Sequence, residues 1–190
     1  MPDPTYETGV IHGRFQVLHN DHVRYLLAGK ALCRHLVVGI TNPDPLLTAE
    51  DTSDPDRSSS LSNPLTYWER FLLVNAALEE NGFSRQQFSV VPLPINHPWA
   101  YQYYVPLKAV FFLSMYDDWT RKKLELFKSL NLKIHILRDV PPEEKGLSAT
   151  EIRQRIVTGQ TWKHMVPAGV YGLLEKWNIS DRLKKIYQEE

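Results

Sequence analysis

The sequence predicts an α/β protein with a doubly wound, Rossmann-like parallel sheet of five to six strands and helices at its C-terminal end. Three observations predict this fold. Short apolar runs recur along the 190 residues, amphipathic helical patterns separate them, and the run Leu-Val-Val-Gly-Ile at 36–40 has no polar position. A strand of that kind is typical of a parallel sheet covered on both faces.

The first elements form a βαβ unit, with a strand at 8–11, a helix at 21–32 and a second strand at 36–40. The helix is predicted by apolar residues with helical spacing, namely Val23, Leu26, Leu27, Ala31 and Leu32. In a fold built from such units, ligands bind outside the carboxyl ends of the strands.

The later elements continue this pattern. We expect strands at 88–93, 110–113 and 133–137, and two terminal helices within about 167–188. Residues 1–190 are most simply a single domain, since the chain is long enough and, at 43% hydrophobic, apolar enough to bury one core. A polar loop at about 43–62 is expected to be mobile and either functional or a tolerated insertion, with insertion favoured for 51–60.

Composition limits the partners and the compartment. Lysine plus arginine equals aspartate plus glutamate at 22 each, so no general basic field favours nucleic acid. No apolar segment approaches a membrane span, and the polar N-terminus lacks the apolar core of a signal peptide. The single cysteine, Cys33, fits a reducing compartment. We therefore expect a cytoplasmic protein with neither a nucleic-acid nor a membrane partner.

A phosphate site is predicted where the first strand meets its helix. The chain there reads Gly13-Arg14-Phe15-Gln16-Val17-Leu18-His19-Asn20-Asp21-His22. A glycine lets the backbone approach a bound group, and the free N–H groups of a first helical turn face an anion. His19 and His22 share one helix face, where they could bind phosphoryl oxygens. The alternatives are two surface histidines or a metal pair, but zinc would need a third ligand.

This run resembles the GRFQPxHxGH form of the HxGH signature of the nucleotidyltransferase superfamily, in particular that of archaeal-type nicotinamide mononucleotide (NMN) adenylyltransferases. Val17 stands where proline is usual, and Asp21 stands where the signature has glycine. A carboxylate there suits the helix dipole but would repel a triphosphate, so Asp21 either points away or tunes the site. The resemblance assigns nucleotide binding or catalysis to Gly13, Arg14, Phe15, Gln16, His19 and His22.

A second run, Leu147-Ser148-Ala149-Thr150-Glu151-Ile152-Arg153, resembles the superfamily signature ISxTxIR. Ser148 and Glu151 form a capping-box pattern, which is the structural alternative. Capping does not require Thr150 or Arg153, however. Hydroxyls, N–H groups and a guanidinium at one helix N-terminus are suited to the β- and γ-phosphates of a nucleotide.

Substrate-side residues are implied by two further resemblances to the archaeal-type enzymes. The segment from Asn63 to Arg70 matches Asn-Pro-x-Thr-x-x-Glu-Arg, which places Arg70 near the substrate phosphate and leaves its side chain free after helix capping. In the loop after 88–93, Trp99 is the candidate for stacking on a nicotinamide ring, and Asn96 is a second candidate contact. Trp99 could instead cover an edge of the core. The family's Asp-Ile-Asn is Pro-Ile-Asn here, which weakens the case for NMN.

The choice of nucleotide is left open by residues 114–122. This segment resembles Gly-Asp-Asp-Trp-x-x-Lys of CTP-using relatives without its glycine, which implies that Asp118 and Trp119 contact the nucleotide. Arg138, after the strand at 133–137, resembles a phosphate-binding arginine of the cytidylyltransferases, with an ordinary surface arginine as the alternative.

These motifs predict one ATP or CTP held between two helix N-termini. A phosphate or phosphonate oxygen of the second substrate would attack the α-phosphorus in line, and pyrophosphate would leave. His19, His22 and Arg153 would stabilise charge, and Mg²⁺ would bridge phosphate oxygens with few or no protein ligands.

Three functions are compatible with the sequence. The first is NMN adenylyl transfer in NAD synthesis, and the second is CTP-dependent transfer to a small phosphate or phosphonate metabolite. The third is a non-catalytic nucleotide-binding regulator, for which Asp21 is the only indication. The family resemblance also implies a homo-oligomer.

Overall fold

The computed structural model describes residues 3–44, 59–116, 118–141 and 146–189. Five parallel strands form one sheet in the order β3-β2-β1-β4-β5. Their bounds are Tyr6–Gly13 (β1), Cys33–Thr41 (β2), Phe88–Leu93 (β3), Val110–Met115 (β4) and Lys133–Asp139 (β5). The predicted doubly wound fold is confirmed. Most of the predicted polar loop at 43–62 lies outside the described residues.

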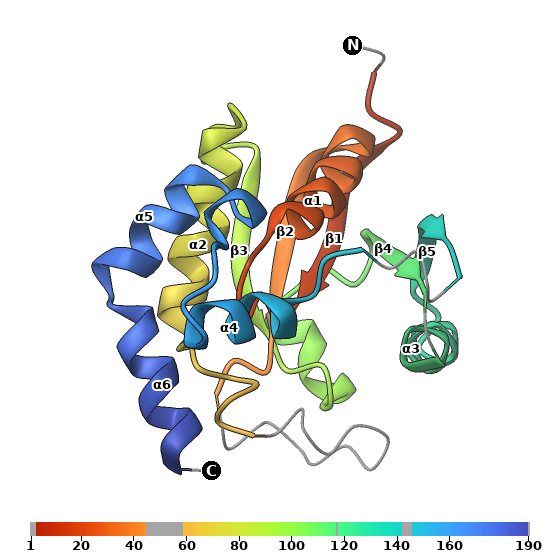
Figure 1. Cartoon of the computed structure of the whole chain (residues 1–190). Coiled ribbons are helices and arrows are strands. Elements are labelled where there is room, and N and C mark those ends of the chain that lie inside the picture. Colours follow the sequence, from red (N-terminus) through yellow and green to blue (C-terminus); the bar gives the residue numbers. More distant parts are fainter. Residues whose placement is uncertain (1–2, 45–58, 117, 142–145, 190) are drawn as a thin grey trace.

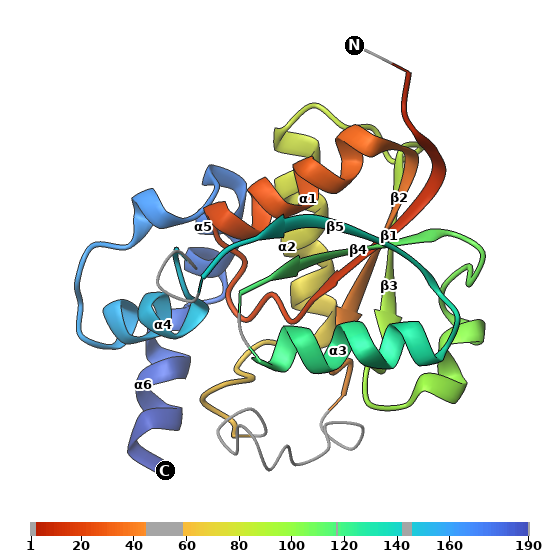
Figure 2. The same cartoon turned by 90° about the vertical axis from the view of Figure 1, so that its right-hand side faces the viewer.

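Helices cover both faces of the sheet (Figures 1 and 2). On one face, α1 (Asn20–Leu32) and α2 (Tyr67–Glu80) bury side chains such as Leu26 and Leu73 in one apolar cluster with Ile11 of β1. On the other face, α3 (Asp118–Ser129) and the short helix η3 (Pro98–Tyr103) pack Phe127 and Tyr101 against the strands. The central strands β1, β2 and β4 are therefore largely buried, as their apolar runs predict, whereas the edge strand β5 is partly exposed.

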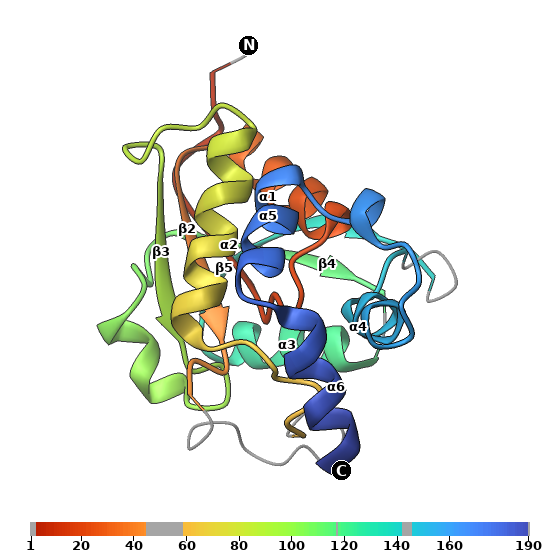
Figure 3. The same cartoon turned by 60° about the vertical axis from the view of Figure 1, so that its left-hand side comes forward.

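The C-terminal helices pack against the α2 side of the molecule. After α4 (Ala149–Val157) and η5 (Lys163–Met165), the chain forms α5 (Ala168–Lys176) and α6 (Ile179–Glu189). Figure 3 shows α5 beside α2, with α6 continuing beyond it toward α4. Arg182 of α6 binds Glu69 at the start of α2, with 2.7 Å between Nη2 and Oε1. None of the helices in the described ranges is long and apolar enough to cross a membrane.

The sheet opens between its central strands. The ladder that joins β1 to β4 contains only the pairs Gly9–Val110 and Val10–Phe111. Beyond these pairs, the hydroxyl of Tyr25 from α1 donates to the Phe112 carbonyl at 2.9 Å and contacts the backbone of His12. Tyr25 thus replaces ladder hydrogen bonds at the carboxyl ends of both strands, where doubly wound folds bind ligands.

Candidate active site

The loop that follows β1 is folded back on itself around Phe15. A Cβ atom at Gly13 would lie 2.9 Å from the Phe15 ring, so this position requires glycine. Phe15 has a φ of 54°, and its buried ring lies edge-on to His22 with 5.1 Å between centroids. The Phe15 side chain therefore belongs to the core beneath the site and does not meet a nucleotide.

Gln16 is occupied by the backbone of Leu65. Its side-chain amide nitrogen donates to the Leu65 carbonyl, and its side-chain oxygen accepts from the Leu65 N–H, both at 2.9 Å. Gln16 is buried, so this pair fixes the segment ahead of α2 to the loop that follows β1. As for Phe15, the side chain of Gln16 is thus engaged within the protein, in contrast to the expectation from the motif.

His19 and His22 form a stacked pair at the start of α1. Nδ1 of His19 accepts from the His22 N–H at 3.4 Å and caps the helix, and the ring centroids lie 3.7 Å apart. Burial lowers the pKa of His19 to about 4, although Asp21 partly opposes this effect. The pKa of His22 is also lowered, by burial first and then by His19 and Arg14. Both imidazoles are therefore neutral at neutral pH before an anion binds.

Arg153 of α4 joins the second signature to the first. Its guanidinium donates to the carbonyl of Gln16 and, at 3.0 Å, to Oγ1 of Thr150. Nε of Arg153 is buried without a hydrogen-bond partner among the described residues. Burial, followed by the charge of Arg14, lowers the pKa of Arg153 to about 10, so Arg153 stays charged at neutral pH. The two signatures are thus in direct contact.

Arg14 lies at the centre of the positive charge. Burial is the main cause that lowers the pKa of His22, Arg70 and Arg153, and the charge of Arg14 lowers each of these pKa values further. Groups that repel one another in this way are stabilised by a polyanion, because each would then gain an opposite charge. The arrangement is suited to a triphosphate.

The N-terminus of α4 is capped by Ser148, whose hydroxyl accepts from the Glu151 N–H at 3.1 Å. The expected capping box is not completed, because the Glu151 carboxylate binds Arg155 at 3.1 Å instead. Thr150 is exposed beside Arg153. Two helix N-termini with a hydroxyl, imidazoles and guanidiniums near them are an arrangement suited to phosphate groups.

Comparison with known proteins identifies the family. The chain is 44% identical over 177 residues to the phosphonoformate cytidylyltransferase of Streptomyces viridochromogenes, and the match covers 93% of this chain and 95% of that protein. It is 30% identical over 184 residues to the nicotinamide-nucleotide adenylyltransferase of Pyrococcus horikoshii, covering 94% of this chain and 88% of that one. The chain belongs to the nucleotidyltransferase superfamily. No family model matches it.

A solved structure agrees on the fold of this nucleotidyltransferase. A bifunctional NMN adenylyltransferase/ADP ribose pyrophosphatase from Francisella tularensis superposes with a TM-score of 0.70 over 97% of this chain. The sequence identity is 17%, so the likeness concerns the fold alone. This chain spans about half of that protein, 53% of its length.

Arg70 of the nucleotidyltransferase is not free, and the expectation that helix capping leaves it available is wrong. Thr66 and Glu69 do form the capping box. The guanidinium of Arg70 is buried, however, and donates to four backbone carbonyls, those of Arg14, Thr41, Asn42 and Thr66. It ties the loop after β1 to the end of β2. In this structure Arg70 holds the loop that follows β1 in place.

The candidate substrate contacts Asn96 and Trp99 lie beyond β3. Both are exposed, Trp99 at 71%, with His97 edge-on to its ring at 6.2 Å. Trp99 therefore does not cover the core. Tyr101 does, since it is buried and donates to the Ile95 carbonyl at 2.6 Å.

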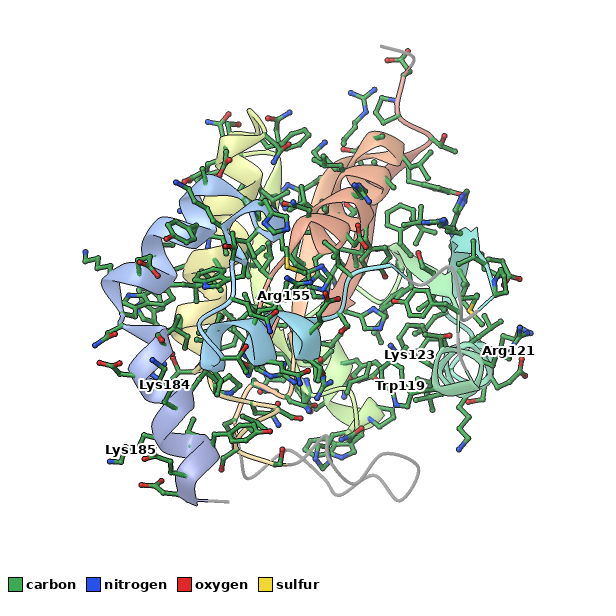
Figure 4. All side chains as sticks on the ribbon, viewed as in Figure 1. Trp119, Arg121, Lys123, Arg155, Lys184 and Lys185 are labelled. Atoms are coloured by element: carbon green, nitrogen blue, oxygen red, sulfur yellow. The ribbon has the colours of Figure 1, made fainter. Side chains whose placement is uncertain are left out.

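On the face of the sheet that it covers, α3 carries Trp119 and Lys123. The Lys123 ammonium lies 3.4 Å from the centroid of the Trp119 ring, and both side chains extend from α3 toward the middle of the molecule (Figure 4). The Asp118 side chain lies outside the described part of the structure. Arg138 is exposed in β5, opposite Ser114.

The sequence motifs did not single out two residues, His12 and Lys123. His12 is buried at the end of β1 against Phe127, its ring nitrogens have no hydrogen-bond partner within the described ranges, and burial followed by Lys123 lowers its pKa. The motif match emphasised Lys122, which is exposed. The helical spacing of four between Trp119 and Lys123 could have identified Lys123 instead.

Proposed function

We propose that this nucleotidyltransferase is a CTP-dependent cytidylyltransferase that acts on a small phosphonate and releases pyrophosphate. The observation that carries the proposal is the 44% identity to a phosphonoformate cytidylyltransferase over nearly all of both chains, against 30% for an NMN adenylyltransferase. Two local features agree with it. Pro94 replaces the aspartate of the NMN-type loop, and Trp119 matches the segment of CTP-using relatives.

The chemistry follows from the charges around the two helix N-termini. A phosphonate oxygen attacks the α-phosphorus, a new P–O bond forms, and the bond to the β-phosphate oxygen breaks with its electron pair leaving on pyrophosphate. Arg14 and Arg153 neutralise the triphosphate, and His19 and His22 donate hydrogen bonds where charge accumulates. Catalysis is then positioning plus electrostatic stabilisation.

Mg²⁺ would be held at this site by the phosphate groups of the nucleotide. Among the described residues, no group of three or more His, Cys, Asp or Glu side chains could hold a metal ion. The catalytic side chains at the site are arginines and histidines, so phosphate oxygens and water would supply the ligands. The ion would add positive charge to the leaving pyrophosphate.

NMN adenylyl transfer is the second candidate. Trp99 favours it, because an exposed indole in the loop after β3 is available to stack on a nicotinamide ring. The segment from Asn63 to Arg70 also matches that family, although Arg70 is engaged by carbonyls. The family resemblance supports a homo-oligomer for either candidate, and the single buried thiol of Cys33 agrees with a cytoplasmic location.

The test is a matrix of pyrophosphate-release assays. CTP and ATP are each combined with phosphonoformate and with NMN, with Mg²⁺ present. We expect release from CTP with phosphonoformate and little from the other three pairs. Release from ATP with NMN alone would establish the second candidate. No release from any pair, with CTP binding seen by calorimetry, would favour a nucleotide-binding regulator.

A further inference from the structure

Asp21 occupies the position at which the HxGH signature has glycine, and it binds the second signature. Oδ2 of Asp21 accepts from the backbone N–H of Leu147 at 2.7 Å. Leu147 directly precedes Ser148, the cap of α4, whereas Asp21 lies in the first turn of α1. One carboxylate therefore joins the two helix N-termini that hold the triphosphate.

Gly146 makes this contact possible. Its φ of +80° is a conformation that favours glycine, and a Cβ atom built there would lie 2.3 Å from Oδ2 of Asp21. Apart from the Asp21 carboxylate, no other described atom would lie within 4 Å of that Cβ atom. The close approach thus depends on glycine at 146 and on the carboxylate at 21 together.

Both oxygens of the Asp21 carboxylate have partners. The second oxygen, Oδ1, binds Nη1 of Arg24 at 2.5 Å. Asp21, Arg24 and Leu147 line a cavity of about 490 Å³ that also includes Arg155, which Figure 4 shows in front between α1 and α4. None of His19, His22 and Arg153 lines that cavity. The negative charge of Asp21 is therefore engaged by the Leu147 N–H and by Arg24, and it also favours a positive charge on His19.

We infer that Asp21 is a positioning residue whose carboxylate fastens the chain ahead of α4 to α1 and sets the spacing of the two phosphate motifs before the nucleotide binds. The inference rests on the proposed nucleotidyl transfer, but it does not depend on the choice of base. It also explains why a carboxylate is acceptable in a signature that binds triphosphates. We call the contact between Asp21 and Leu147 the latch.

Kinetics with CTP and phosphonoformate provide the first test. The charge-assisted hydrogen bond of Asp21 only prepares the binding site. Its loss should therefore weaken the binding of CTP equally in the ground state and in the transition state. Asp21→Ala should therefore raise KM for CTP about tenfold with kcat little changed. Asp21→Asn keeps an acceptor oxygen and should recover most of the affinity. An unchanged KM in Asp21→Ala, or a loss confined to kcat, would overturn the inference.

Matched glycine variants separate the latch from backbone strain. Gly146→Ala should raise KM as Asp21→Ala does. Gly82→Ala is the control, because Gly82 has a φ of +83° and no described atom lies within 4 Å of a Cβ built there. The KM for CTP of the double variant Asp21→Ala/Gly146→Ala should be no higher than the higher of the two single-variant values. The reason is that the methyl group added at position 146 then meets no carboxylate. Additive effects, or an equal rise in KM in Gly82→Ala, would contradict the latch.

Amide hydrogen exchange provides a readout that needs no turnover. In the nucleotide-free protein, the Leu147 N–H should exchange faster in Asp21→Ala and Gly146→Ala than in the parent, and as slowly as the parent in Gly82→Ala. Equal exchange rates in Asp21→Ala and the parent would exclude the latch whatever the activity. A parent without pyrophosphate release would instead contradict the proposed function and leave the exchange result valid.

Discussion

The imidazole of His19 caps the helix that carries His22 and stacks on the His22 ring with 3.7 Å between centroids. One residue thus orients the other, and both have a pKa below the ordinary value. Neutral histidines donate hydrogen bonds to phosphoryl oxygens through N–H, and an incoming polyanion favours their protonation. This pair is the basis for the first two predictions.

Replacing His22 should remove catalysis and leave the fold intact. We expect His22→Ala to lower kcat by about two to four orders of magnitude, because a preorganised donor to the developing charge is lost. The far-UV circular dichroism spectrum should not change. His164→Ala is the matched control, since His164 is an exposed histidine outside the phosphate motifs. Comparable kcat values in the two variants would refute the assignment of His22.

His19 should make stability depend on pH. The unfolded chain takes up a proton near pH 6.5, whereas folded His19 does so near pH 4, so the free energy of unfolding falls as pH drops through this window. The loss attributable to His19 is on the order of 3 kcal/mol. His19→Asn keeps a capping acceptor without titrating, and urea denaturation should show a shallower pH dependence. An identical pH dependence would contradict this account.

Arg70 should prove structural. We expect Arg70→Ala to lower the free energy of unfolding by about 3 to 5 kcal/mol, because four buried carbonyls lose a charged donor. Arg34→Ala is the comparison, since Arg34 makes an exposed ion pair with Glu7 at 3.3 Å and should change stability by less than about 1 kcal/mol. Urea denaturation measures both. An Arg70→Ala protein as stable as the parent would restore Arg70 as a candidate substrate contact.

Trp99 distinguishes the two candidate acceptors. A small phosphonate offers no ring, so Trp99→Ala should leave its KM within about twofold of the parent value. If NMN is also accepted, loss of stacking should raise the KM for NMN about tenfold. Steady-state kinetics with each acceptor measure this difference. A large rise in the KM for phosphonoformate would show that Trp99 has another role in the site.

Much of the fold could be predicted because the strands are strongly apolar and the helices begin at clear caps. The strand at 88–93 has the observed bounds, and the helix expected at 21–32 begins one residue earlier, at Asn20. Strand ends were underestimated where polar residues such as His12 and Arg138 continue the pairing. The apolar pattern of the strands is weaker at their carboxyl ends, because polar residues of the candidate active site lie there.

The side-chain roles within the motifs could be predicted less well. A motif records which residues occur together, but it does not say which of them face the ligand. Phe15, Gln16 and Arg70 occur in phosphate or substrate motifs. All three side chains are nevertheless buried, and they stabilise the loop that follows β1. The latch formed by Asp21 could not be predicted from the sequence for a related reason. Its partner is a backbone N–H 126 residues away along the chain, and a backbone group leaves no sequence pattern.

The central claim is that an oxygen of the acceptor becomes bonded to the α-phosphorus of a triphosphate held between α1 and α4. The most direct test uses phosphonoformate labelled with ¹⁸O in its phosphonate group, with CTP as donor and ³¹P NMR of the products. The account predicts unlabelled pyrophosphate and a cytidylylated phosphonate whose α-phosphorus carries the labelled bridging oxygen. Labelled oxygen on a β- or γ-phosphorus, with release of CMP or CDP, would contradict it.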